Sequence, residues 1–301
     1  MAPAKTDITK ELLLLLLLAT CWGASYSFIR VGVATIPPIT LIAARTLIAG
    51  VVLLVIIRWR GLSLPRDPAV WRWFLIQSCL NSAIPFTLIA WAEQTLDAGL
   101  ATILNSTTPI FAFLIAAILL RTERLTGRKL FGVIAGMAGI CLIIGVDALH
   151  GVGQQLPAQL AVVAASICYA SAALFGRNFK GLDPMMPAAG SLLCGAALLI
   201  PASLIVEHPW QLAPSTASIL SLLGLSVVST ALAFSIYFRL IQTLGSVGTT
   251  AQAYLRVPIG VGIGVIFLGE PVSSTAAIGL VCVVAGVMAM TIAPRKKVTA
   301  E

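Results

Sequence analysis

Apolar runs about as long as a membrane is thick follow one another along most of this chain. A helix needs about 20 apolar residues to cross the hydrocarbon core of a bilayer. Hydrophobic residues make up 59% of the 301 positions and charged residues only 10%, a balance too apolar for the surface of a soluble domain. We therefore predict an all-α membrane protein with ten transmembrane helices, at residues 12–34, 38–57, 73–95, 98–120, 128–147, 156–176, 185–206, 216–241, 246–268 and 273–292.

The basic residues indicate how these helices are oriented. Most of the 19 lysines and arginines fall in alternate connections, which face the cytoplasm when the N-terminus does. The connections on the other side carry acidic residues instead, namely Glu93, Asp97, Asp147, Glu207 and Glu270. Both termini are therefore predicted to be cytoplasmic. The net charge of +8 lies in short clusters between apolar runs, so we expect no nucleic-acid partner.

The cysteines and the catalytic motifs give no indication of chemistry. All six cysteines lie within apolar runs, and the sequence contains no CxxC and no Cys/His spacing of a metal site. Buried small hydrophobic residues are the plain interpretation, so we expect no disulfide framework, no metal and no cofactor. Because the chain also lacks HExxH and GxSxG motifs, it is predicted not to be an enzyme.

The two halves of the chain match at a shift of 147 residues. Trp22 and Arg30 fall on Tyr169 and Arg177, each an aromatic residue followed by an arginine at the same spacing. Further landmarks at the same shift are Asn105 and Gln252, Glu123 and Glu270, Gly132 and Gly279, and Gly139 and Gly286. A five-helix unit ends on the opposite side of the membrane from its start, so a second copy must be inverted. We predict two inverted five-helix repeats, residues 12–147 and 156–292, an arrangement typical of transporters.

Three motifs occur once in each half and carry a family resemblance. The first half reads Pro109-Ile-Phe-Ala-Phe-Leu, then Glu123-Arg-Leu-Thr-Gly, then Gly132-Val-Ile-Ala-Gly-Met-Ala-Gly139. The second half reads Arg256-Val-Pro258, then Leu268-Gly-Glu270-Pro, then Gly279-Leu-Val-Cys-Val-Val-Ala-Gly286. These resemble the EamA-type repeat of the drug/metabolite transporter superfamily. One departure is Thr122, which stands before Glu123 where the family usually has glycine.

The resemblance implies ten helices, alternating access, and export of amino acids, other metabolites or drugs. Within the superfamily, the chain most resembles the YddG-type exporters of aromatic amino acids. The resemblance and the orientation together predict a multi-pass protein of the cell inner membrane. A drug or nucleotide-sugar carrier of the same fold is the alternative, and an intramembrane enzyme is a further one. We expect a small-molecule substrate and the lipid bilayer as partners, with a monomer favoured over an oligomer.

Polar and helix-breaking residues inside apolar runs are the candidates for a binding site. Freed backbone groups beside a proline can serve a polar ligand, and buried amides need a partner. The candidate substrate-binding residues are Trp22, Tyr26, Asn81, Pro85, Trp91, Asn105, Pro109, Tyr169, Tyr237, Tyr254, Arg256 and Pro258. The alternatives are a kink for each proline, an interface position for each aromatic residue, and interhelical hydrogen bonds for each asparagine.

Two arginines and the distribution of carboxylates complete the set. Arg256 is predicted to attract a substrate carboxylate, whereas Arg45 is predicted to reach the membrane surface or to cap a helix end. No Asp or Glu lies in the middle of an apolar run, although proton-coupled carriers usually place a titratable group in the pathway. The sequence therefore predicts downhill transport without strong proton coupling.

Overall fold

The computed structural model describes residues 8–92, 95–96, 103–121, 126–144, 152, 155–259 and 274–291. The side chains of Tyr26, Ser27, Arg30, Ile144, Ala276 and Thr291 lie outside this description, as do the motif residues 122–125 and 260–273. Every regular element within the described residues is a helix, which confirms the all-α prediction.

The labelled helices have the following bounds: α1 (Ile8–Gly32), α2 (Pro38–Trp59), α3 (Pro68–Ser78), α4 (Ile84–Ala92), α6 (Thr108–Leu114), α7 (Gly127–Ile144), α8 (Leu156–Phe175), α9 (Met185–Val206), α10 (Thr216–Ser226), α11 (Ala233–Thr243), α12 (Gly245–Thr250) and α14 (Ser274–Thr291). Residues 252–259 are also helical. Three π-helical segments, Cys79–Ala83, Ile115–Leu119 and Val227–Leu232, continue α3, α6 and α10. Two 3₁₀ turns lie at Gly176–Phe179 and Pro209–Gln211.

Long apolar helices make this a multi-pass membrane protein. Six helical stretches in the described part of the chain are long and apolar enough to cross a bilayer: Ile8–Ser25, Pro38–Trp59, Pro68–Ala92, Leu156–Phe179, Met185–Val206 and Thr216–Thr243. Two shorter apolar helices are Ile103–Leu119 and Ala277–Met290. Each of the ten predicted ranges overlaps a described helix, and ten as the number of crossings stays a prediction.

Large apolar side chains cover the outside of the bundle. Val55 on α2 is 61% exposed, Ile205 on α9 is 73% exposed and Val281 on α14 is 68% exposed. Such surfaces suit lipid, in which the backbone polar groups must be satisfied within each helix. Both the outer and the inner faces of these helices are therefore apolar.

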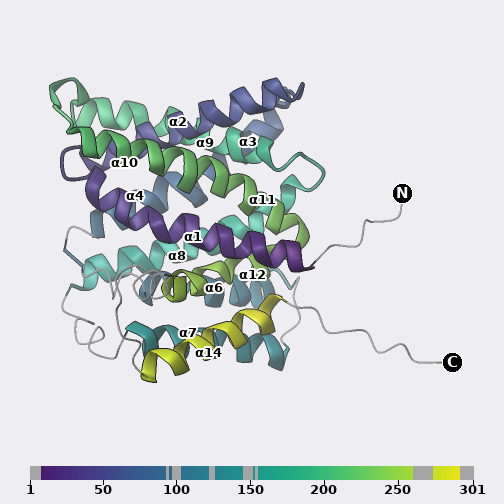
Figure 1. Cartoon of the computed structure of the whole chain (residues 1–301). Helices are drawn as coiled ribbons and strands as arrows, with labels where there is room; N and C mark the ends of the chain where they lie inside the picture. Colours follow the sequence, from purple (N-terminus) through teal and green to yellow (C-terminus); the bar gives the residue numbers. More distant parts are fainter. Residues whose placement is uncertain are drawn as a thin grey trace.

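Helices α2 and α9 lie next to each other (Figure 1) and run antiparallel. The start of α2 meets the end of α9, where Glu207 accepts hydrogen bonds from the backbone N–H of Ile39 at 2.9 Å and of Thr40 at 2.6 Å. These N–H groups belong to the first turn of α2, which has no intrahelical acceptors for them. A carboxylate at this position also stabilises the helix through its dipole.

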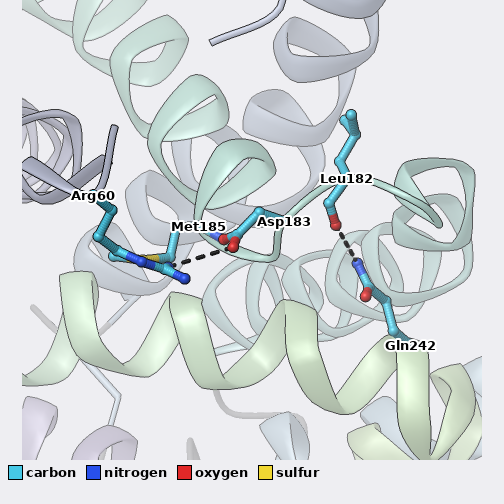
Figure 2. A network of polar contacts seen from close by, with 5 residues as sticks. All are labelled: Arg60, Leu182, Asp183, Met185 and Gln242. Atoms are coloured by element: carbon cyan, nitrogen blue, oxygen red, sulfur yellow. Dashed lines mark hydrogen bonds and ion pairs between the residues drawn. The ribbon is translucent and has the colours of Figure 1, made fainter. Parts of the chain in front are cut away.

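The other end of the α2 and α9 pair is held by a polar network (Figure 2). The Arg60 guanidinium donates to Met185 Sδ at 3.1 Å and lies 3.4 Å from Asp183 Oδ2. In the same view Gln242 Nε2, from α11, donates to the Leu182 carbonyl at 3.2 Å. The loop before α9 is thus fixed to α2 and to α11.

Helices α7 and α14 pack at the lower edge of the bundle in Figure 1 through glycines. A Cβ at Gly132 would lie 2.8 Å from the Gly286 carbonyl oxygen, and one at Gly139 would lie 2.6 Å from the Gly279 carbonyl oxygen. The contacts are therefore antiparallel. The repeat shift matches Gly132 with Gly279 and Gly139 with Gly286. In the structure the contacts are exchanged, since Gly132 meets Gly286 and Gly139 meets Gly279. A two-fold axis in the membrane plane produces this crossing, which supports the inverted relation of the two halves.

The π-helical segments Cys79–Ala83 and Val227–Leu232 lie at matching places in the two halves. Ser82 and Ser229, one in each segment, are separated by the repeat shift, since 229 − 82 = 147. A π-bulge redirects the side chains that follow it and is frequent at functional sites. Both segments adjoin the cavity described next.

Candidate functional site

A cavity lies between the two halves of the bundle. It is bordered by α1, α2, α4, α6, α8, α11 and α12, and by residues 252–259. The space without protein atoms is about 870 Å³, including the part open to solvent. Sites for small organic ligands commonly have volumes of about 300–1,000 Å³. The cavity therefore suits a metabolite.

Half of the predicted binding residues line this cavity. They are Trp22, Asn81, Asn105, Tyr169, Tyr237 and Arg256. Trp22 and Tyr169, which the repeat shift relates, are both among them. The structure therefore brings together side chains that are as much as 234 positions apart (256 − 22 = 234).

The other predicted residues lie elsewhere in the described structure. Trp91 is 50% exposed on the outer surface, and Tyr254 is buried beside Gly136, donating from its hydroxyl to the Val133 carbonyl at 3.4 Å. The prolines Pro85, Pro109 and Pro258 also do not line the cavity. Pro85 and Pro109 are buried within their helices. Neighbouring residues of the three proline-containing helices do line the cavity, among them Phe86, Thr108 and Arg256. The side chain of Tyr26 falls outside the described residues.

Arg45 is the largest correction to the sequence analysis. It lies two turns into α2 and is 2% exposed, so it neither reaches the membrane surface nor caps a helix. Its Nε donates to Thr230 Oγ1 at 2.7 Å, and its guanidinium carbon lies 4.0 Å from the centre of the Phe86 ring. Thr230, in the π-helical segment Val227–Leu232, in turn donates to the carbonyl of Leu225 at 2.7 Å, five residues earlier in α10. The π-helical segment Val227–Leu232 thus supplies the acceptor that fixes Arg45.

Arg256 occupies a similar aromatic setting at the other wall. Its guanidinium carbon lies 5.3 Å from the centre of the Trp22 ring, within the range of a cation–π contact. Its Nε donates to Gln252 Oε1 at 3.0 Å, one helical turn away. Trp22 also packs against Tyr237 and Phe234, with ring centres 5.4 Å and 6.2 Å apart.

Several buried polar atoms beside or near the cavity have no protein partner. Among the described residues, Asn81 Nδ2 and the Tyr237 hydroxyl make no hydrogen bond, although both residues are at most 4% exposed. Both amide atoms of Gln77, one turn before Asn81, are likewise buried without a hydrogen bond in the described structure. A buried polar group without a partner costs about 1–3 kcal/mol. Such groups beside a cavity are available to a ligand or to water.

No carboxylate occurs among the described residues that line the cavity, whereas Arg45 and Arg256 both do. The same part of the chain contains no group of acidic, histidine or cysteine side chains that could hold a metal. The lining thus combines uncharged polar side chains and two arginines with aromatic and aliphatic side chains.

The cavity extends to one end of the bundle, and an ion pair joins helices at the other. Its lining along α1 runs from Trp22 to Val33, near the C-terminal end of that helix. At the N-terminal end of α1, Glu11 is buried and accepts from Arg239 Nη2 at 2.7 Å and from the Thr243 hydroxyl at 2.9 Å. Glu11 precedes the predicted first span, so the sequence analysis did not consider it a membrane residue.

Phe86, Phe234 and Gln252 are among the cavity residues that were not recognised as candidates from the sequence. Phe86 and Phe234 are apolar residues within apolar segments, and nothing in the sequence distinguishes them from phenylalanines that face lipid. Gln252 was matched to Asn105 by the repeat shift, which was the available signal. Both amides line the cavity, one from each half.

Comparisons with known proteins agree with this architecture. The chain matches the EamA-like transporter family twice, over residues 9–145 and over residues 156–292. It is 27% identical to the inner membrane transporter YedA of Escherichia coli, over 90% of this chain and 87% of that protein. It is 26% identical to a "Probable terminal-alkyne amino-acid exporter" of Streptantibioticus cattleyicolor, over 93% of each chain.

Two further likenesses cover nearly the whole chain. It is 25% identical to a "Probable amino-acid metabolite efflux pump" of Salmonella typhimurium, over 92% of this chain and 93% of that protein. A crystal structure with 20% sequence identity superimposes with a TM-score of 0.77, covering 94% of this chain and 97% of the other, which shows a shared fold. The family match spans both halves of the bundle that enclose the cavity. The chain therefore belongs to the EamA-like transporter family, and it is a multi-pass membrane transporter.

Proposed function

We propose that this transporter exports amino acids or closely related small metabolites across the cell inner membrane by alternating access. The observation that carries the proposal is the cavity between the two halves, which combines aromatic walls with arginines and unpartnered polar groups. Aromatic walls suit neutral and aromatic side chains, and the arginines suit a carboxylate. Two relatives bear names of amino-acid or amino-acid-metabolite exporters, which supports the same class.

The proposed mechanism uses ten membrane crossings in two inverted halves, with both termini in the cytoplasm. The antiparallel pairing of α2 with α9 and of α7 with α14 supports it, because these are equivalent helices of the two halves. In this orientation the cavity extends toward the outer face, and the Glu11 and Arg239 pair closes the cytoplasmic end. Rocking of one half against the other would break that pair, open the cavity to the cytoplasm and close it to the outer face.

Transport is proposed to run downhill and in a monomer. The lining supports downhill movement, because its described residues include no carboxylate or histidine that could carry a coupling proton. The packing of Gly132 and Gly139 against α14 accounts for these glycines within a single chain. An imposed pH gradient is therefore expected to leave the initial rate of amino-acid exchange unchanged, and a steep dependence would contradict uncoupled transport.

The competing assignment is a carrier of nucleotide sugars or drugs with the same fold. A nucleotide diphosphate carries at least two negative charges and usually engages several basic side chains. The described lining contains two basic residues, Arg45 and Arg256. In each of them Nε already donates a hydrogen bond to a neighbouring side chain. A cationic drug would meet two arginines and no described carboxylate. Both alternatives thus fit the cavity less well than an amino acid does.

Substrate counterflow tests the proposal. Purified protein is reconstituted into liposomes that are preloaded with one unlabelled amino acid at a time. Uptake of the same amino acid, labelled, from outside is then followed. We expect saturable exchange of neutral or aromatic amino acids, strongly reduced by Trp22→Ala and by Arg256→Ala. The control is Trp210→Ala, because Trp210 is 65% exposed and outside the cavity. Lack of exchange across the whole panel, with folded protein in the vesicles, would rule out the amino-acid assignment.

A further inference from the structure

We infer that the cavity recognises the carboxylate of an organic acid with an aromatic or branched apolar body, held by Arg45, and that an α-ammonium group adds little to binding. This inference rests on the proposed function and narrows it from amino acids to carboxylates in general. Deaminated or N-acylated amino acids would then bind as well as the amino acids themselves.

Arg45 is held ready for an anion. Its Nε donates to Thr230, and the face of its guanidinium packs on the Phe86 ring. The two Nη groups have no hydrogen-bond partner among the described residues. The guanidinium is 2% exposed, and no described carboxylate lines the cavity. A buried charge without an opposite charge is strongly unfavourable, and a planar fork of N–H donors matches a carboxylate in shape and charge. A carboxylate ligand would satisfy both requirements.

The unpartnered polar atoms of the cavity are also donors. Asn81 Nδ2 is buried without a partner in the described residues and can donate to an oxygen. The Tyr237 hydroxyl lies beside the Gln77 amide and can donate as well as accept. The amide oxygen of Gln252, in contrast, already accepts from Arg256 at 3.0 Å. The lining thus offers hydrogen-bond donors to a ligand and uses a prominent acceptor internally. An acceptor-rich head group such as a carboxylate complements this arrangement.

The places where an ammonium could bind are taken or repulsive. Aromatic faces attract cations, but Phe86 is covered by Arg45, and Trp22 has Arg256 over its ring. Hydroxyl oxygens such as those of Thr108 and Thr250 remain able to accept, since each hydroxyl donates to its own helix. Neutral hydroxyls do not offset the repulsion from the Arg45 charge in a cavity of low dielectric constant.

The rest of the lining provides for the apolar body. Trp22, Phe234 and Tyr237 form one aromatic cluster, and Phe86 and Tyr169, with ring centres 6.3 Å apart, form a second. A ring or branched chain between these clusters would be buried on both sides. Burial of this kind gives affinity without requiring charge.

Four ligands of one shape separate the contributions of the two charged groups. They are 3-phenylpropanoate (carboxylate only), phenylalanine (both groups), 2-phenylethylamine (ammonium only) and 3-phenylpropanamide (neither). Binding to the purified full-length protein is measured by direct radioligand titration, and the same ligands are used in counterflow. We expect 3-phenylpropanoate to bind at least as tightly as phenylalanine, because the cavity offers the ammonium group no favourable contact. Both should bind about ten- to hundredfold more tightly than the amide and the amine, as expected for charge-assisted hydrogen bonds.

The variants place the effect on Arg45. Arg45→Gln should weaken 3-phenylpropanoate by about ten- to hundredfold and leave 3-phenylpropanamide unchanged. Arg45→Lys keeps the positive charge but loses the planar pair of N–H donors. Its affinity for 3-phenylpropanoate should lie between those of the unmodified protein and of Arg45→Gln. Arg58→Gln is the matched control, since Arg58 is on the same helix and exposed. If Arg45→Gln does not fold, the four-ligand comparison on the unmodified protein still decides the question.

The outcomes distinguish this inference from the proposed function. Binding of 2-phenylethylamine as tight as that of 3-phenylpropanoate, or an Arg45→Gln variant that binds 3-phenylpropanoate like the Arg58→Gln control, would overturn it. A fifth ligand, 2-phenylethyl phosphate, tests the head group: tighter binding of it than of 3-phenylpropanoate would overturn the choice of carboxylate. Counterflow of phenylalanine without binding of 3-phenylpropanoate would overturn the inference and leave the amino-acid exporter intact. Exchange of 3-phenylpropanoate with no exchange of any amino acid would support it and refute the amino-acid assignment.

Discussion

The crossing of α7 and α14 gives the most direct test of the packing. A Cβ placed on Gly139 would lie 2.6 Å from the Gly279 carbonyl oxygen and 2.8 Å from the Val283 backbone nitrogen. Ordinary van der Waals contact begins at 3.4 Å, so Gly139→Ala requires a separation of 3.4 − 2.6 = 0.8 Å. Because both contacts are with backbone, no side-chain rotation can relieve them.

The cost of this separation follows from two opposed contributions. Overpacking a tight interface costs about 1–3 kcal/mol, and replacing a helical glycine by alanine returns up to about 1 kcal/mol. We expect Gly139→Ala to lower the free energy of unfolding by about 1–2 kcal/mol. The matched control is Gly127→Ala in the first turn of α7, where an added Cβ meets nothing within 4 Å.

Thermal unfolding of the detergent-solubilised protein, followed by size-exclusion chromatography of heated samples, measures the effect. Gly279→Ala should cost a similar amount, since its Cβ would lie 2.7 Å from the Gly139 carbonyl oxygen. The double variant should cost less than the sum, because the first substitution has already moved the helices apart. Equal melting temperatures for Gly139→Ala and Gly127→Ala would refute the close crossing.

Three further predictions concern the cavity and the ends of the helices. Tyr237→Phe should weaken substrate binding by about tenfold at an unchanged melting temperature, whereas Tyr254→Phe, outside the cavity, should leave counterflow affinity unchanged. Glu11→Gln should lower the free energy of unfolding by about 1–2 kcal/mol, because it discharges a buried partner of a half-exposed arginine, and Lys10→Gln, on the exposed side, should have no effect on thermal stability. Glu207→Ala should cost about 1 kcal/mol in the same assay through the loss of the α2 cap, and an unchanged melting temperature would contradict that capping role.

The sequence by itself determined the fold class and the helix positions. Runs of about 20 apolar residues can hardly form anything else, because a membrane requires all backbone hydrogen bonds to be made within each element. The starts of α2 and α9 coincide with the predicted residues 38 and 185, where Pro37-Pro38 and Pro184 interrupt the apolar runs. Motifs in both halves also indicate the family, which the match over residues 9–145 and 156–292 confirms.

Which side chains face the cavity was decided only by the tertiary structure. In a soluble helix the polar face marks the outside, but here lipid and protein interior are both apolar, so periodicity does not separate Trp91 from Trp22. Trp91 is 50% exposed on the surface, whereas Trp22 lines the cavity.

The role of Arg45 required the structure for a related reason. Its partner Thr230 is 185 residues away, and a π-bulge in the second half brings that hydroxyl to the guanidinium. A sequence read locally offers an intramembrane arginine only the nearest surface or helix end. Long-range contacts between the two halves fix its position within the cavity, since they exist only once the helices have packed.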